Sequence, residues 1–196
     1  SVAGNTVLGE TALDAVVSGG SNTAIGKESL GNNTSGASNT GVGFQSIFDN
    51  TTGSQNTAVG VQALANNTTA SDNTGTGFGA LFLNTTGASN TAVGSLALKV
   101  NTTGTRNTAV GANALDSNTT ANDNTAVGQE VLQANTTGAS NTGLGRAALI
   151  SNTTASNNTG IGYYALLSNT TGTQNVAVGA LALDANTTAS ANTAVG

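Results

Sequence analysis

Residues 56–72 read NTAVGVQALANNTTASD, and the same pattern begins again at Asn73. The chain of 196 residues repeats this 17-residue unit from one end to the other, and no insertion interrupts the phase. Unbroken phase indicates that each unit stacks on the one before it. Residues 1–196 are therefore a single repeat array, with full repeats over 5–191 and partial repeats at both ends, 1–4 and 192–196. Because neither end carries an atypical capping unit, we expect a segment of a longer fibre.

Each position of the repeat defines a column, numbered 1 to 17 from its Asn, and the columns differ in how freely they vary. Column 1 is always Asn, column 5 is always Gly, and column 9 is Leu with one exception. Columns 2 to 4 read Thr, a small residue and an aliphatic residue in nearly every repeat, and columns 12 to 14 usually read Asn-Thr-Thr. The pairs at columns 6–7, 10–11 and 16–17 vary freely and hold every charged residue. These pairs should face solvent, because burying an unpaired charge is costly.

The length of the repeat decides the fold class. It is too short for repeats of paired helices, which need about 33 to 47 residues. Thr-Ala-Val-Gly is short, β-branched and bounded by Asn and Gly, which is typical of a strand. The sequence therefore predicts an all-β fold, a parallel β-solenoid (a β-roll or β-helix) of about eleven and a half coils and roughly 55 Å in length. One alternative stays open: columns 6 and 10 are four residues apart, so columns 6 to 11 could form a helical turn.

The predicted core is thin, with about two large apolar side chains in each coil. If the aliphatic residue of column 4 points inward beside the Leu of column 9, strand alternation places the Thr of column 2 inward and columns 3 and 5 outward. An outward column restricted to Ala and Gly then requires something to approach it closely. The opposite wall of a flat coil would do so, but we favour a partner chain, and hence a homo-oligomer. The Asn of column 1 is expected to stack its amide on the next coil.

Composition excludes several kinds of chemistry. The chain has no Cys and no His, which excludes disulfides, thiol chemistry, the common zinc sites and His-dependent catalysis. A net charge of −5 argues against a nucleic-acid partner. No apolar run approaches the roughly 18 residues of a membrane span, so we expect no membrane insertion of this segment. The carboxylates never recur as a pair, and we predict no enzymatic activity, no cofactor and no metal site.

The Asn-Thr-Thr columns, with Asn-Thr-Ser in one repeat, form N-x-Ser/Thr sequences that can accept N-linked sugar. The alternative is a turn with a Thr ladder that serves packing alone. Regular Thr ranks could also order water and bind ice, but adjacent Thr residues in a strand point to opposite faces. The candidate glycosylation sites are Asn33, Asn50, Asn67, Asn84, Asn101, Asn118, Asn135, Asn152, Asn169 and Asn186.

The aromatic residues all lie in the freely varying pairs, where they would be exposed. They are candidates for contacts with a carbohydrate, with a cell-surface ligand or with a neighbouring chain. These candidate contact residues are Phe44, Phe48, Phe78, Phe82, Tyr163 and Tyr164.

Asn-Thr-Ala-Ile-Gly at residues 22–26, and its equivalents at columns 1 to 5 of the other repeats, resemble the signature of the YadA-like heads of trimeric autotransporter adhesins. The full unit is similar to repeat arrays of the same period in bacterial surface proteins and phage tail-fibre-like proteins. The resemblance to the heads implies a β-roll of three chains on a bacterial surface. The departure is the period, which is shorter in those heads than in this chain.

The sequence as a whole predicts a structural role. We expect the shaft of an extracellular filament, on a cell surface or a phage particle, that assembles with copies of itself side by side or end to end. An adhesin head that binds host matrix or sugar through its aromatic residues is the alternative, and ice binding is a third and less favoured hypothesis.

Overall fold

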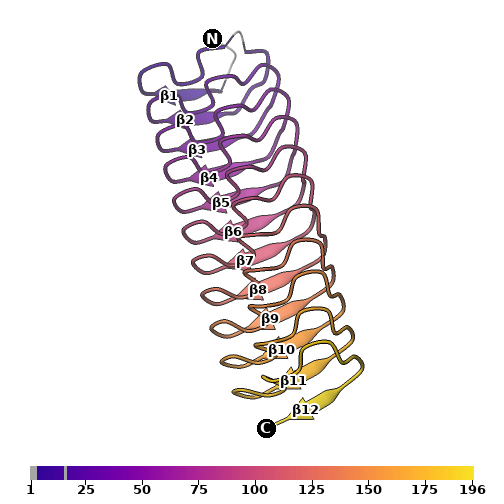
Figure 1. The fold of residues 1–196 in the computed structure, drawn as a ribbon. Helices are drawn as coiled ribbons and strands as arrows, with labels where there is room; N and C mark the ends of the chain where they lie inside the picture. The colour runs from indigo at the N-terminus through magenta and orange to yellow at the C-terminus, as the bar shows by residue number, and fades with distance from the viewer. Residues whose placement is uncertain (1–3, 16) are drawn as a thin grey trace.

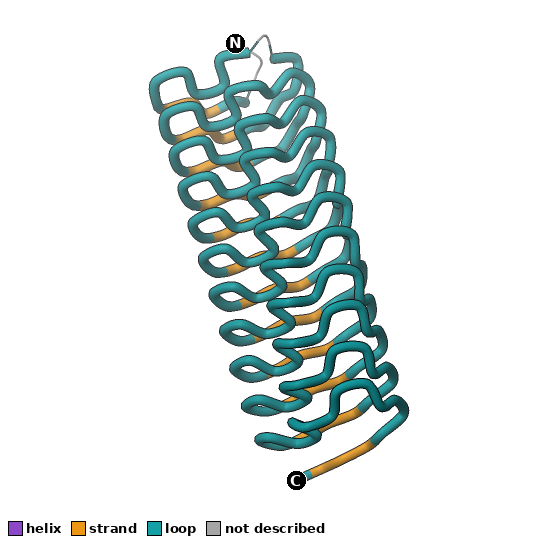
Figure 2. Tube along the Cα trace, in the orientation of Figure 1, coloured by secondary structure: helices purple, strands orange, loops and turns teal. Residues whose placement is uncertain are grey.

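The computed structural model describes residues 4–15 and 17–196, and over these residues the chain is a rod of stacked coils (Figure 1). Each repeat makes one coil, and the coils follow one another along the rod in chain order. Each coil has one short strand, and turns make up the rest of it (Figure 2). No helix occurs in the described residues.

The strands lie at columns 2 to 4 and form one parallel sheet in chain order. Each strand pairs with the equivalent strand of the next coil, column for column, as in the pairing of Thr108 with Thr125. The predicted parallel β-solenoid is thus confirmed for the described residues. The strands are β1 (Thr6–Leu8), β2 (Thr23–Ile25), β3 (Thr40–Val42), β4 (Thr57–Val59), β5 (Thr74–Thr76), β6 (Thr91–Val93), β7 (Thr108–Val110), β8 (Thr125–Val127), β9 (Thr142–Leu144), β10 (Thr159–Ile161), β11 (Val176–Val178) and β12 (Thr193–Val195).

Columns 6 to 11 form successive tight turns, so the helical alternative for this segment is wrong. Gln62 and Leu64, in columns 7 and 9, have φ of 58° and 53°, whereas a helix needs negative φ at every residue. The backbone N–H of Leu64 donates to the carbonyl of Ala80 in the next coil at 2.9 Å. In a helix this N–H would donate to the carbonyl four residues earlier in the same segment, but here it donates to the next coil.

The core contains column 3 and not column 4. Ala58 is completely buried, whereas its neighbour Val59 is 40% exposed. The predictions that columns 2 and 4 point inward and that column 3 points outward are therefore wrong. The alternation along the strand was predicted correctly, but its phase was reversed. Only a small side chain fits inside the coil at column 3, because the strand lies close to the Leu of column 9 on the opposite side of the coil. A Cβ added to Gly75 would lie 3.4 Å from Leu64 Cγ.

This correction removes the argument for a partner chain. The small residues of column 3 face the Leu of column 9 within the same chain, and that Leu fills the space beside them. The flat-coil explanation accounts for the small residues, and the homo-oligomer stays an untested prediction.

The Gly of column 5 marks a corner that no other residue could occupy. Gly60 has φ of 141°, a conformation that residues with a side chain rarely adopt. A Cβ at this position would also lie 2.5 Å from the carbonyl oxygen of Gly77 in the next coil. Both constraints recur from coil to coil, which explains why column 5 does not vary.

Two ladders of buried Asn side chains run along the rod, one in column 1 and one in column 12. In column 1, Asn90 Oδ1 accepts from the backbone N–H of Asn107 at 2.9 Å, and Asn107 Nδ2 donates to the carbonyl of Ala121 at 2.8 Å. In column 12, Asn118 Nδ2 donates to Asn101 Oδ1 at 2.8 Å and to the same Ala121 carbonyl at 3.2 Å. The two ladders thus tie each coil to its neighbour and close the coil on itself.

Candidate functional surfaces

The candidate glycosylation sites lie in the interior of the rod. All except Asn186 are fully buried. Asn101 is representative, since its Nδ2 donates to Asn84 Oδ1 at 2.8 Å and to the carbonyl of Gly104 at 2.9 Å. A sugar joined to Nδ2 would have to displace these bonds and would have no room inside the coil. Glycosylation stays a prediction, but the folded rod favours a packing role for these Asn side chains.

The Thr residues that follow these Asn residues have two different environments. In column 13, Thr102 Oγ1 donates to the carbonyl of Thr119 in the next coil at 3.0 Å, and the same bond recurs in the neighbouring coils. This is the Thr ladder that the packing alternative predicts. Column 14 is exposed, as at Thr103. The column 12 Asn cannot share an outward face with this Thr, because it is buried.

The aromatic candidates lie on turns, outside the sheet. Phe44, Phe78 and Tyr163 occupy column 6, and Phe78 is the most exposed of them at 55%. Phe48 and Phe82 occupy column 10 and are half-buried. The structure therefore brings Phe78 close to Phe82, and Tyr163 close to Tyr164, and these two pairs lie in different coils of the rod.

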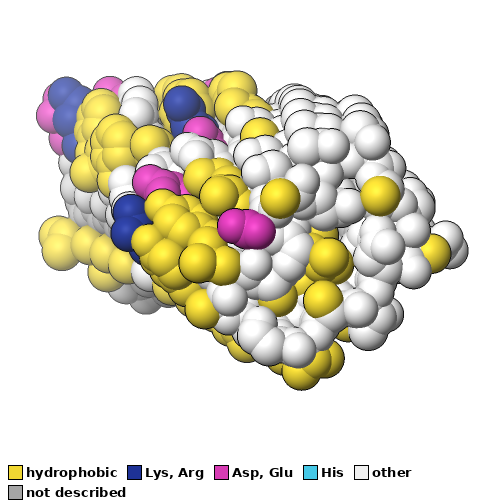
Figure 3. Space-filling model, turned by 60° about the horizontal axis from the view of Figure 1, so that its bottom comes forward, with side chains coloured by type: hydrophobic (Ala, Val, Ile, Leu, Met, Phe, Trp, Pro, Cys, Tyr) yellow, Lys and Arg dark blue, Asp and Glu magenta, His cyan; other side chains and the backbone are white. Residues whose placement is uncertain are grey.

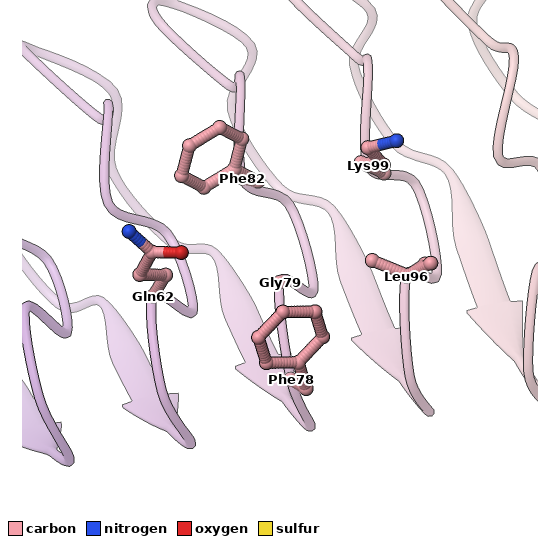
Figure 4. A pocket seen from close by; sticks show the side chains of 6 residues that line it. All are labelled: Gln62, Phe78, Gly79, Phe82, Leu96 and Lys99. Atoms are coloured by element: carbon pink, nitrogen blue, oxygen red, sulfur yellow. The ribbon is translucent and has the colours of Figure 1, made fainter.

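A shallow recess of about 120 Å³ lies beside Phe78 and Phe82. Figure 4 shows the two rings on one coil, with Gln62 on the coil before and Lys99 on the coil after. The recess is smaller than the roughly 300–1,000 Å³ of typical ligand pockets. It could hold part of a sugar ring against an aromatic face, but it does not enclose a ligand.

The second aromatic contact is between Tyr163 and Tyr164. Their ring centroids are 4.2 Å apart, and the hydrogen bond with Tyr164 raises the pKa of the Tyr163 hydroxyl above its usual range. Arg146 from the preceding coil lies 6.0 Å from the centre of the Tyr164 ring, near the limit for a cation–π contact. Tyr163 is 46% exposed and Tyr164 is half-buried, so the pair lies at the surface of the rod.

Charged side chains make local contacts between coils. Arg106 Nε and Nη2 donate to the two carboxylate oxygens of Asp123 at 2.7 and 3.0 Å, and this hydrogen bonding lowers the pKa of Asp123. Partial burial raises the pKa of Asp116, an effect that the charge of Lys99 partly offsets. Figure 3 shows charged side chains gathered on one part of the visible surface, while the opposite part carries none.

The outward face of the sheet is the surface that the sequence reasoning missed. It consists of the Thr residues of column 2 and the aliphatic residues of column 4, here called the sheet face, and it runs from β1 to β12. Val59 and Leu144 are 40% and 46% exposed. The signal in the sequence was the Thr-x-Val spacing, which places both side chains on one side of a strand. This spacing alone does not show whether the shared side of the strand faces solvent or the core.

No family model matches this chain, and neither a curated protein nor a solved structure is significantly similar to it. The resemblance to YadA-like heads and to tail-fibre arrays therefore stays a prediction. In the described residues, no cluster of three or more His, Cys, Asp or Glu side chains could bind a metal ion, and no helix is suited to crossing a membrane.

Proposed function

We propose that this chain is the shaft of an extracellular filament, carried on a cell surface or on a phage particle. The observation that carries the proposal is continuous hydrogen bonding along the rod axis. In addition to the sheet, the two Asn ladders and the Thr ladder of column 13 connect successive coils, the ladders of columns 12 and 13 starting at Asn33 and Thr34. A rod of this kind resists extension, because stretching must break several ladders at the same coil.

The scarcity of cleavage sites supports an extracellular position. The chain has four Lys and Arg residues in total, and all of them lie in turns. The backbone of these turns is itself bonded to neighbouring coils, as between Arg106 N–H and the carbonyl of Ala88 at 3.1 Å. A protease that needs an extended, detached segment would find none at these positions.

Trypsin digestion tests the continuous shaft. We expect the folded rod to stay intact under conditions in which the urea-unfolded chain is cut at Lys27, Lys99, Arg106 and Arg146. Rapid cutting of the folded chain at the central sites would overturn the proposal. Location is tested separately with antibody against the rod on intact cells and particles, where labelling that requires permeabilised cells would contradict a surface position. Sedimentation velocity measures whether copies assemble.

An adhesin role is the second candidate, and the exposed ring of Phe78 beside the recess favours it. Binding to a panel of immobilised glycans and matrix proteins would be compared between the wild type, Phe78→Ser with Phe82→Ser, and Tyr163→Ser as a matched aromatic control. Binding that persists in all three proteins, or that none of them shows, would exclude the recess as a binding site.

A further inference from the structure

The sheet face is half-buried in most coils and exposed in some, yet it varies much less than the freely varying pairs. Column 2 is Thr in every strand except β11, and column 4 is aliphatic in every strand except β5. No charged residue occurs in either column, although the freely varying pairs hold all of them. General strand preference would also admit Tyr, Phe and Trp, and neither column contains one. The restriction therefore needs a cause besides strand formation.

The Thr hydroxyls of this face are not used by the fold. In column 13 the Thr hydroxyl donates to a backbone carbonyl, as Thr102 does to Thr119 at 3.0 Å. Among the described residues, no column 2 Thr hydroxyl makes a hydrogen bond to the protein. Thr91 and Thr108 are half-buried on the outward side of the sheet, where their hydroxyls remain available to water.

The positions of these groups are regular and rigid. Successive strands are in register along the described sheet, as for Thr91 with Thr108 and Val93 with Val110. The side chains of one column form a rank along the rod with a spacing of about 4.8 Å. The rank of column 2 and the rank of column 4 lie about 6.6 Å apart across the strand. The column 1 Asn ladder lies directly beside the strands and holds this spacing. Strand direction changes only gradually along the rod (Figure 1), so neighbouring groups stay aligned.

Water next to this face meets a repeating pattern of hydroxyl anchors and methyl groups. Hydroxyl groups at this spacing can each hydrogen-bond a water molecule, whereas water beside the methyl groups can bond only to other water. The spacing along a rank is close to the repeat of oxygen atoms on a face of hexagonal ice. We propose that the sheet face binds ice through this ordered water, with Thr of column 2 and the aliphatic residues of column 4 as the contact groups.

A second copy of the chain fits the same face less well. The face is about 55 Å long and roughly 10 Å wide, or about 550 Å² on each copy, below the roughly 800 Å² per partner of a standard stable interface. Columns 2 and 4 also hold no charged residue by which a second copy would be oriented. Ice needs none, because its surface repeats in the same regular way as these two columns.

The proposal is tested by measuring thermal hysteresis and ice-crystal shape with the purified chain. Thr108→Lys places a long charged side chain in the centre of the sheet face, and we expect it to abolish both effects. Thr103→Lys makes the same substitution on the exposed column 14, and we expect it to keep them. Val93→Lys is a second variant on the sheet face, in the other rank.

Each outcome decides the proposal. Circular dichroism and thermal melts of each variant separate loss of ice binding from loss of folding, and Val93→Lys provides the test if Thr108→Lys fails to fold. A wild-type chain without thermal hysteresis would overturn the proposal, as would equal losses in Thr103→Lys and Thr108→Lys. A dimer that Thr108→Lys dissociates, without any effect on ice, would assign the face to self-association. These results are independent of the cellular location that the proposed shaft requires.

Discussion

Asn90 lies near the middle of the column 1 ladder, where the contribution of a single rung to stability can be measured. Its Nδ2 donates to the carbonyl of Gly104 at 2.8 Å, and its Oδ1 accepts from the backbone N–H and from Nδ2 of Asn107 at 2.9 and 3.2 Å. The side chain is fully buried. Asn90→Ala removes all three bonds and leaves the buried N–H of Asn107 without an acceptor. The carbonyl of Gly104 keeps one donor, Asn101 Nδ2 at 2.9 Å.

The expected loss of stability follows from these contacts. The bond to the Gly104 carbonyl contributes a net of about 1 kcal/mol, and leaving the buried N–H of Asn107 unsatisfied costs about 1–3 kcal/mol. Asn90→Ala should therefore lower the free energy of unfolding by about 2–4 kcal/mol. This is a large fraction of the total of a typical domain, about 5–15 kcal/mol.

Urea unfolding followed by circular dichroism measures this loss. Because a repeat protein can open locally, hydrogen exchange of the Asn107 amide should be followed as well. Ser89→Ala, one residue earlier on an exposed turn, is the control and should change little. The reasoning is refuted if Asn90→Ala differs from Ser89→Ala by less than about 1 kcal/mol while the Asn107 amide keeps its protection.

Two further predictions concern the core and an acidic side chain. Ala109→Val in column 3 should destabilise the rod by about 1–3 kcal/mol, because the opposite side of the coil leaves no room for the added methyl groups. Val110→Ala on the outward side of the strand should cost less. Equal losses of stability in urea unfolding would contradict the finding that column 3 faces the core. Asp116 has its pKa raised mainly by burial, and one of its buried oxygens has no hydrogen-bond partner. A raised folded pKa makes the ionised form destabilising at neutral pH, and this cost fades as the pH falls through the folded pKa. Asp116→Asn should therefore raise the melting temperature at pH 7 and lose this advantage near pH 3, and an advantage independent of pH would show that the charge is not the cause.

Part of the candidate surface could be predicted from the sequence, and part could not. The exposure of Phe78 followed from its place in a freely varying pair. The burial of Asn101 did not, because an N-x-Thr sequence looks the same whether its amide faces solvent or a neighbouring coil. Only the stacked coils show that Asn84 Oδ1 and the Gly104 carbonyl occupy both hydrogens of that amide.

The period and its unbroken phase were sufficient to determine a parallel β-solenoid, because so short a repeat allows one coil and holds too little chain for a helix pair. The recurring Asn of column 1 likewise predicted one of the two amide ladders. Tertiary structure alone decided which side of the strand is inside. Side chains alternate between the two sides of a strand, and this alternation allows either column 3 or columns 2 and 4 to face the core. The choice depends on the volume inside the coil, between the strand and the turns opposite it. That volume admits the methyl group of Ala58 opposite a buried Leu, and it leaves Val59 and the Thr rank on the surface.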